Sequence, residues 1–243
     1  MKDAWGRTIE YVRLSLTDAC NFCCPYCRPA EITPQSQHQL LSVDEWMTIL
    51  GAFHQVGVKA VRLTGGEPLL YPHIEELLAR IKQTGWFEDI SMTTNGSLLA
   101  LRAKKLKELG LNRVNISLDS LDSDAFALCV GKANQLDSVL SGIQSAIDAG
   151  FTSVKINTVL SRHWTDDEVH DLLTYVETWP VIWRFIEYMP FQGDAFHGPT
   201  FDEWKAQLER VSGGILTENH GVYGFGPATY YNLPSGKEIG FIF

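Results

Sequence analysis

Short runs of β-branched and apolar residues alternate along this chain with longer segments in which apolar residues recur every three or four positions. The short runs predict strands at 11–17, 60–64, 90–94, 113–118, 153–159 and 181–188. The longer segments predict helices at 43–56, 74–84, 99–109, 135–149 and 166–179. Ser42 and Glu45 form a predicted capping box, and glycines stand where the helices should end, at Gly57, Gly85, Gly110 and Gly150.

This alternation of strand and helix predicts an α/β fold with a parallel sheet, arranged as a partial (β/α)6 TIM-like barrel. The chain has 243 residues and is 45% hydrophobic, which is enough to bury a large core. Beyond residue 190 the pattern changes to a helix at 202–211 and short β-like pieces at 214–217, 228–233 and 238–243. We therefore predict a barrel domain over 1–190 and, over 191–243, the start of a C-terminal β-containing extension that is truncated.

In barrels of this kind the chemistry lies at the C-terminal ends of the strands, in the loops that follow them. Small, polar or ligand-capable residues follow every predicted strand, in the segments 20–27, 64–68, 93–96, 117–120, 157–158 and 187–190. Turn chemistry explains part of this pattern. The rest predicts a functional site at these strand ends.

The first of these loops carries Cys20, Cys24 and Cys27 in a C-x3-C-x2-C arrangement. A cubane iron–sulfur cluster normally has four cysteine ligands, so a cubane on three thiolates would leave one iron open to a small molecule. The alternative is a structural zinc site, which would need a fourth ligand. The nearest downstream histidine is His38, and no second C-x2-C or H-x3-5-H pair follows.

The remaining cysteines, the net charge and the absence of long apolar stretches limit the functions that this chain can have. Cys23, adjacent to Cys24, is interpreted as a bystander, and Cys129 as a buried core thiol. The net charge of −9 argues against general nucleic-acid binding, although a few converging cations can still hold a small anion. No leader and no apolar stretch of about 18 residues is present, which predicts a cytoplasmic protein with no membrane association. The scattered histidines receive no catalytic role.

The cysteine pattern, with Tyr26 before its last member and Gly65-Gly66-Glu67-Pro68 one strand later, resembles the radical S-adenosylmethionine (SAM) superfamily. More narrowly, the chain resembles the GTP 3',8-cyclases of molybdenum cofactor biosynthesis in the segments 13–22, 62–68, 93–96, 115–120, 155–157 and 184–189. The likeness spans nearly the whole chain. It implies a lyase that converts GTP to 3',8-cyclo-7,8-dihydro-GTP.

For the cofactors, the resemblance implies a 4Fe-4S cluster on Cys20, Cys24 and Cys27 whose open iron binds the amino and carboxylate groups of SAM. It further implies that Gly65, Gly66 and Glu67 meet the SAM amino group, and that the adenosine end is held by Tyr26, Ser117 and Met189. The structural alternatives are loop packing for Tyr26, a turn hydroxyl for Ser117 and core filling for Met189.

For the substrate, the resemblance implies that GTP is bound by Arg13, Arg62, Thr93 and Lys155. It also implies that four cations belong to the catalytic site: Arg13, Arg62, Lys155 and, as a weaker candidate, Arg184. A cation inside a barrel is costly unless an anion pairs with it, so a triphosphate is a suitable partner. The alternative is pairing with internal carboxylates, namely Glu67, Asp119 or Glu187.

The implied reaction is reductive cleavage of SAM to a 5'-deoxyadenosyl radical, hydrogen abstraction from the ribose C3' of GTP, and attack of that carbon on guanine C8. A reductant protein such as a flavodoxin or ferredoxin would supply the electron, and a homodimer is left open. The family's second cysteine trio, which holds another 4Fe-4S cluster, and its accompanying arginines have no counterpart in these residues. The chain is therefore either a fragment of a longer cyclase or a shortened relative. The shortened relative would be a radical SAM paralogue that acts on another nucleotide, or a non-catalytic protein that binds SAM or GTP.

Overall fold

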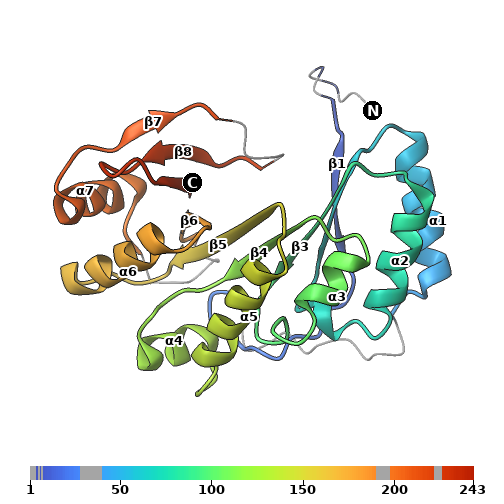
Figure 1. Cartoon of the computed structure of the whole chain (residues 1–243), viewed down its shortest axis with the longest axis horizontal. Helices are drawn as coiled ribbons and strands as arrows, with labels where there is room; N and C mark the ends of the chain where they lie inside the picture. The colour runs from blue at the N-terminus through green and yellow to red at the C-terminus, as the bar shows by residue number, and fades with distance from the viewer. Residues whose placement is uncertain (1–3, 5, 7, 28–39, 190–197, 222–225) are drawn as a thin grey trace. The chain divides into compact units, whose positions relative to one another are not determined.

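The computed structural model describes residues 4, 6, 8–27, 40–189, 198–221 and 226–243 (Figure 1). The chain folds as two compact units, and both are assembled from separate stretches of sequence. The first unit comprises Met1–Asn21, Ile32–Ile116 and Ser138–Val154. The second comprises Phe22–Glu31, Ser117–Asp137 and Lys155–Phe243. The predicted division at residue 190 stays a prediction.

The first unit is built on parallel strands in the order β1 (Tyr11–Ser15), β2 (Ala60–Thr64), β3 (Asp89–Thr94) and β4 (Arg113–Ser117). Its helices are α1 (Val43–Gln55), α2 (Ile74–Thr84), α3 (Ala103–Glu108) and α5 (Leu136–Asp148), with a short 3₁₀ helix, η2 (Pro68–Leu70). The strand interiors are buried because helices cover them, as a parallel sheet requires. The α/β prediction is confirmed here.

The second unit continues the α/β pattern and then departs from it. Strands β5 (Ser153–Leu160), β6 (Ile182–Glu187) and β9 (Glu238–Ile242) run parallel, and β8 (Thr229–Asn232) and β7 (Thr217–Asn219) complete the sheet in antiparallel fashion. The helices are α4 (Ser123–Val130), α6 (Asp166–Thr178) and α7 (Phe201–Ser212). Strand β9 is apolar because it lies inside the sheet, where it pairs with β6 and β8 and where Ile239 and Phe241 are buried.

Local sequence signals account for most element boundaries. The capping box between Ser42 and Glu45 is confirmed, and Thr165 and Thr200 cap α6 and α7 in the same way. The predicted glycines after the helices adopt positive φ values, which a residue without Cβ tolerates. Among the described residues, every helix is too short or too polar to span a lipid bilayer.

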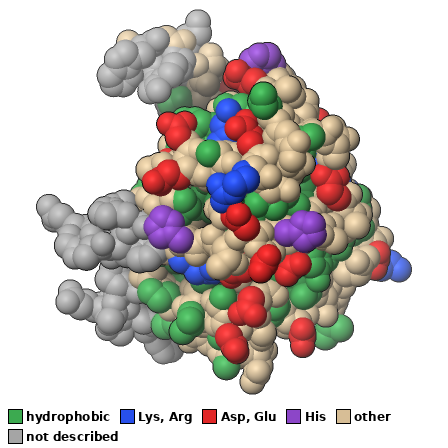
Figure 2. Space-filling model, turned by 90° about the vertical axis from the view of Figure 1, so that its left-hand side faces the viewer, with side chains coloured by type: hydrophobic (Ala, Val, Ile, Leu, Met, Phe, Trp, Pro, Cys, Tyr) green, Lys and Arg blue, Asp and Glu red, His purple; other side chains and the backbone are tan. Residues whose placement is uncertain are grey.

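The predicted helices differ from the observed ones in two places. The helix predicted at 99–109 begins only at Ala103, because the preceding residues form turns in which Leu99 is buried and Leu101 points into solvent. Helix α4 was missed altogether, although Asp122 caps its start and Gly131 ends it in a left-handed conformation. Figure 2 shows acidic side chains scattered over the face that it presents, in keeping with the net charge of −9.

Candidate functional site

The glycines after β2 pack directly against the backbone that leads into the cysteine loop. The Gly66 N–H donates to the carbonyl of Thr17 at 2.7 Å, and the Glu67 N–H donates to the carbonyl of Ala19 at the same distance. A Cβ on Gly66 would stand 2.3 Å from the Ala19 carbonyl oxygen, closer than any real contact. Glycine is therefore required at this point by the close approach of two backbones, and that approach fixes the segment before Cys20.

The Glu67 side chain is buried within the first unit and turned toward the end of β3. One carboxylate oxygen accepts from the Leu69 N–H at 3.0 Å and the Thr94 hydroxyl at 2.8 Å, and the other accepts from the Asn95 N–H at 2.7 Å. Burial raises the pKa of Glu67, against the lowering effect of these donors. The carboxylate thus holds the ends of β2 and β3 together, so only the backbone of this residue is left to form the edge predicted to meet SAM.

The predicted ligand cysteines lie on irregular backbone after β1. Cys20 and Cys24 are half-buried, Cys27 is exposed, and all three thiols are free of disulfides. The Cys27 N–H donates to the Cys24 carbonyl at 3.0 Å, which makes a turn of the last two ligand positions. Three accessible, reduced thiols on one loop fit the donor set of a cubane, in which each cysteine binds a different iron.

The zinc alternative and the two remaining cysteines can also be compared with the structure. Among the described residues, no three Cys, His, Asp or Glu side chains gather around a common point as the ligands of a single ion would. Cys23 is exposed and its N–H donates to the carbonyl of Val130 at 2.9 Å. Cys129 is buried, as predicted for a core thiol.

Tyr26 is anchored in the second unit by a buried acid. Its hydroxyl donates to Asp119 at 2.5 Å, and the other oxygen of Asp119 accepts from the Val159 N–H at 2.8 Å. Burial raises the pKa of Asp119 from 3.8 to about 6, partly offset by these two donors. Burial and the neighbouring Asp119 also raise the pKa of Tyr26 well above its usual range, so its hydroxyl keeps its proton.

Asp119 should give the protein a stability term that depends on pH. Because its pKa is raised on folding, the folded state binds more protons than the unfolded state between about pH 4 and 6, and stability falls as pH rises through that window. We expect the free energy of unfolding of wild type to fall by at most about 3 kcal/mol across it relative to Asp119→Asn. Urea unfolding at four pH values measures this; two parallel pH profiles would contradict it.

Beside Tyr26 lies a pocket of about 460 Å³ within the second unit. Its lining combines the cysteine loop, α4, the end of β5 and the end of β6, through Pro25, Tyr26, Ala125, Leu128, Cys129, Ser161, Arg162 and Tyr188. Ser117 and Met189 do not line it. Met189 is 64% exposed, so the core-filling alternative for this residue is wrong.

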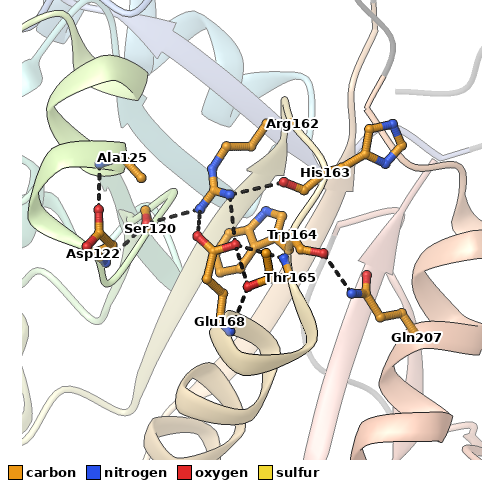
Figure 3. Close-up of polar contacts among 9 residues, drawn as sticks. All are labelled: Ser120, Asp122, Ala125, Arg162, His163, Trp164, Thr165, Glu168 and Gln207. Carbon is orange, nitrogen blue, oxygen red and sulfur yellow. Dashed lines mark hydrogen bonds and ion pairs between the residues drawn. The ribbon is translucent and has the colours of Figure 1, made fainter.

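Arg162 forms a fixed part of this pocket's wall (Figure 3). Its guanidinium donates to both carboxylate oxygens of Glu168, at 2.7 and 3.1 Å, and to the Ser120 hydroxyl at 3.3 Å. It also lies 4.6 Å from the centre of the Trp164 ring. Glu168 closes the capping box of α6 with Thr165, so the loop between β5 and α6 is held at several points.

In the first unit, the structure places the predicted substrate residues on neighbouring strands. Arg13 of β1 is in register with Arg62 of β2. Arg62 is buried, donates to the Ser91 hydroxyl at 3.3 Å and lies 5.2 Å from the centre of the Tyr11 ring. Thr93 accepts from the Asn115 amide at 3.4 Å. Arg13, by contrast, is exposed.

In the second unit, both predicted cations are buried and touch neutral groups. The Lys155 ammonium donates to the Tyr230 hydroxyl at 3.3 Å, and Arg184 donates twice to the Asn157 amide oxygen, at 3.0 and 2.6 Å. A Cβ on Gly240 would stand 2.9 Å from the Cγ atom of Arg184, so β9 lies against the aliphatic part of this side chain. Sequence reasoning missed Tyr230, since nothing in the sequence showed that β8 would face β5 residues.

A family model described as the radical SAM superfamily matches residues 14–176. The chain is 41% identical over 246 aligned residues to "GTP 3',8-cyclase 2" of Pseudomonas aeruginosa, covering 99% of this chain and 73% of that protein. It is 40% identical to the GTP 3',8-cyclase of Pelotomaculum thermopropionicum, covering 100% of this chain and 76% of that one.

Solved structures with a similar fold are more distant in sequence. SuiB of Streptococcus suis, bound to S-adenosylmethionine, superposes with a TM-score of 0.65 at 20% identity, covering 84% of this chain and 46% of that one. A radical SAM methyltransferase from Sphaerobacter thermophilus superposes with a TM-score of 0.66 at 15% identity, covering 84% of this chain and 64% of that one. These similarities establish the fold.

Proposed function

The chain belongs to the radical SAM superfamily and, within it, to the GTP 3',8-cyclase family, and we infer from this membership that it is a lyase converting GTP to 3',8-cyclo-7,8-dihydro-GTP in molybdenum cofactor biosynthesis. When bound, a 4Fe-4S cluster and SAM supply the radical that starts this conversion. The protein's own residues hold these groups, orient the nucleotide and exclude water.

The observation that carries this proposal is the close approach of the Gly65-Gly66 turn to the backbone of Thr17 and Ala19. It fixes the strand end predicted to meet SAM beside the start of the cysteine loop. Cys20, Cys24 and Cys27 are the proposed cluster ligands. The sequence has five cysteines, so a single cluster is proposed for these residues.

For SAM, we assign the backbone of Gly65, Gly66 and Glu67 to its amino group. Tyr26, Ser117 and Met189 are assigned to the adenosine end. The pocket beside Tyr26 supports the assignment of Tyr26, because its mainly apolar lining suits a purine. Ser117 and Met189 are assigned by the resemblance alone. Asp119 orients Tyr26 through its hydroxyl.

For GTP, we assign Arg13, Arg62 and Thr93 in the first unit and Lys155 in the second, with Arg184 as a further cation. The burial of Lys155 and Arg184 supports this, because a buried cation gains most from a bound anion. The internal carboxylates Glu67 and Asp119 are engaged by hydroxyl and N–H donors of their own units. We further propose a reductant protein such as a flavodoxin or ferredoxin, a homodimer and a cytoplasmic site of action.

Anoxic reconstitution tests the proposal. We expect about four irons and four sulfides per chain, and release of 5'-deoxyadenosine from SAM that GTP stimulates and ATP does not. One zinc with no iron would contradict the cluster. Deoxyadenosine release stimulated by another nucleotide would favour the alternative of a paralogue with a different substrate.

Tyr230→Phe tests whether Lys155 binds GTP, because it removes a hydrogen-bond partner of the Lys155 ammonium. The hydroxyl accepts from the Lys155 ammonium, so its loss removes one hydrogen bond that places the cation, worth about 0.5–1.5 kcal/mol. We expect the KM for GTP to rise about 2- to 10-fold with little change in SAM affinity. Tyr231→Phe is the matched control, since the Tyr231 ring packs against Phe241 instead. Equal effects of the two variants would exclude this role.

A further inference from the structure

Asn95 joins the glycine turn to the cysteine loop within the first unit. It stands directly after β3, where its N–H donates to the Glu67 carboxylate at 2.7 Å. Its side-chain nitrogen, Nδ2, donates to the Asn21 side-chain oxygen at 2.8 Å and lies 3.9 Å from the Cys20 Sγ atom, within reach of an N–H···S contact. Asn95 therefore contacts both the buried Glu67 carboxylate and the proposed cluster ligand Cys20.

The orientation of the Asn95 amide is fixed by its other contacts. Its oxygen accepts from both the N–H and the hydroxyl of Ser97, at 3.0 and 2.7 Å. Rotating the amide by half a turn would place its NH2 group against the Ser97 N–H and leave that donor without an acceptor. The Ser97 hydroxyl in turn accepts from the Asn21 amide at 2.9 Å. The donor end of Asn95 is thus held toward Cys20 and Asn21.

We propose that Asn95 is a positioning residue for the cluster, which fixes Cys20 and raises the cluster's reduction potential by directing an N–H toward the Cys20 sulfur. The inference rests on the proposed function, since it needs a cluster bound through Cys20. A hydrogen bond to a ligand sulfur stabilises the reduced, more negative form of the cluster more than the oxidised form. The buried Glu67 carboxylate holds Asn95 in place, which gives the acid of the glycine turn a role away from SAM.

The test is a redox titration of the reconstituted protein, followed by electron paramagnetic resonance. Asn95→Asp keeps the shape of the side chain but replaces the donor with a negative charge. We expect the ratio of reduced to oxidised cluster at a given potential to fall about tenfold, which corresponds to 59 mV. Asn95→Leu, which removes the donor without adding charge, should lower the ratio less, by about threefold.

The control is Asn112→Asp, in the same unit, whose side-chain oxygen accepts from the Ile90 N–H and which can keep that contact as an acid. It adds the same charge away from the cysteine loop, and its potential should match wild type. If the Asn95 variants fail to take up iron, Ser97→Ala decides: it removes the hydroxyl contacts with Asn95 and Asn21 while the backbone N–H stays, so the Asn95 donor is present but held less firmly, and the potential should fall slightly at full iron content.

The possible results distinguish a failure of the Asn95 role from a failure of the proposed function. Wild type that binds no iron would overturn the proposed function itself. Wild type with four irons and SAM cleavage, together with Asn95 variants of unchanged potential, would overturn only this inference. An equal shift in Asn112→Asp would also overturn it, because charge alone would then explain the effect.

Discussion

Gly66→Ala is expected to lower the free energy of unfolding by about 3–5 kcal/mol and to abolish iron uptake. The added Cβ would lie 2.3 Å from the Ala19 carbonyl oxygen and 2.6 Å from that of Asp18. Both obstacles are backbone atoms, so no side-chain rotation relieves the clash. The two strand-end segments must move apart, which breaks the hydrogen bonds from Gly66 to Thr17 and from Glu67 to Ala19.

The control for this substitution is Gly213→Ala. Gly213 has a φ of +75°, and no neighbouring atom would meet its Cβ within 4 Å. Alanine there carries backbone strain alone, about 1 kcal/mol. We expect that variant to take up iron like wild type. Chemical unfolding and iron analysis on the same samples measure both effects, and a Gly66→Ala protein with full iron content would contradict the steric argument.

Lys155→Met is expected to reduce GTP affinity by about 30- to 1000-fold while leaving the fold intact. Methionine fills a similar volume but carries no charge, and loss of a buried ionic contact to a ligand typically costs about 2–4 kcal/mol. Methionine preserves the packing of this buried side chain, so we expect the free energy of unfolding to stay within about 1.5 kcal/mol of wild type. A cation that serves GTP would then lower GTP affinity with little loss of stability, whereas a structural cation would lower stability and leave GTP affinity unchanged.

The measurement pairs GTP binding by calorimetry with urea unfolding of the same protein. Lys104→Met, on the exposed side of α3, removes the same charge from the surface and should change neither quantity. If Lys155→Met bound GTP normally but unfolded more easily, the residue would be structural, and its assignment to the nucleotide would fail.

The fold was predictable from the sequence where a single signal dominates. Helix α1 begins at its predicted capping box, and the six strand–helix repeats follow the periodicity of apolar residues. Helix α3 was predicted too long because Leu99 continues the apolar spacing while its backbone forms a turn. The parallel pairing of β9 with β6 was not predictable, since contacts between residues 56 positions apart leave no periodic trace.

The site was predictable in its ligand types and not in its supporting contacts. The cysteine spacing and the glycine turn stand out in the sequence because both require particular residue types. Asn95 belongs to a segment that was noted, yet its role depends on an amide orientation set by Ser97. Tyr230 lies 75 residues from Lys155, and only the sheet order of the second unit brings the two together.

The late arrival of β9 has a consequence for protein synthesis. Strand β6 pairs with β5 on one side and gains its other partner only with residues 238–242, so that edge of β6 stays open while a ribosome makes the intervening 50 or so residues. The Tyr230 contact with Lys155 is likewise absent during that interval. Until β9 is made, the open edge of β6 is therefore a place where a strand of another chain can pair.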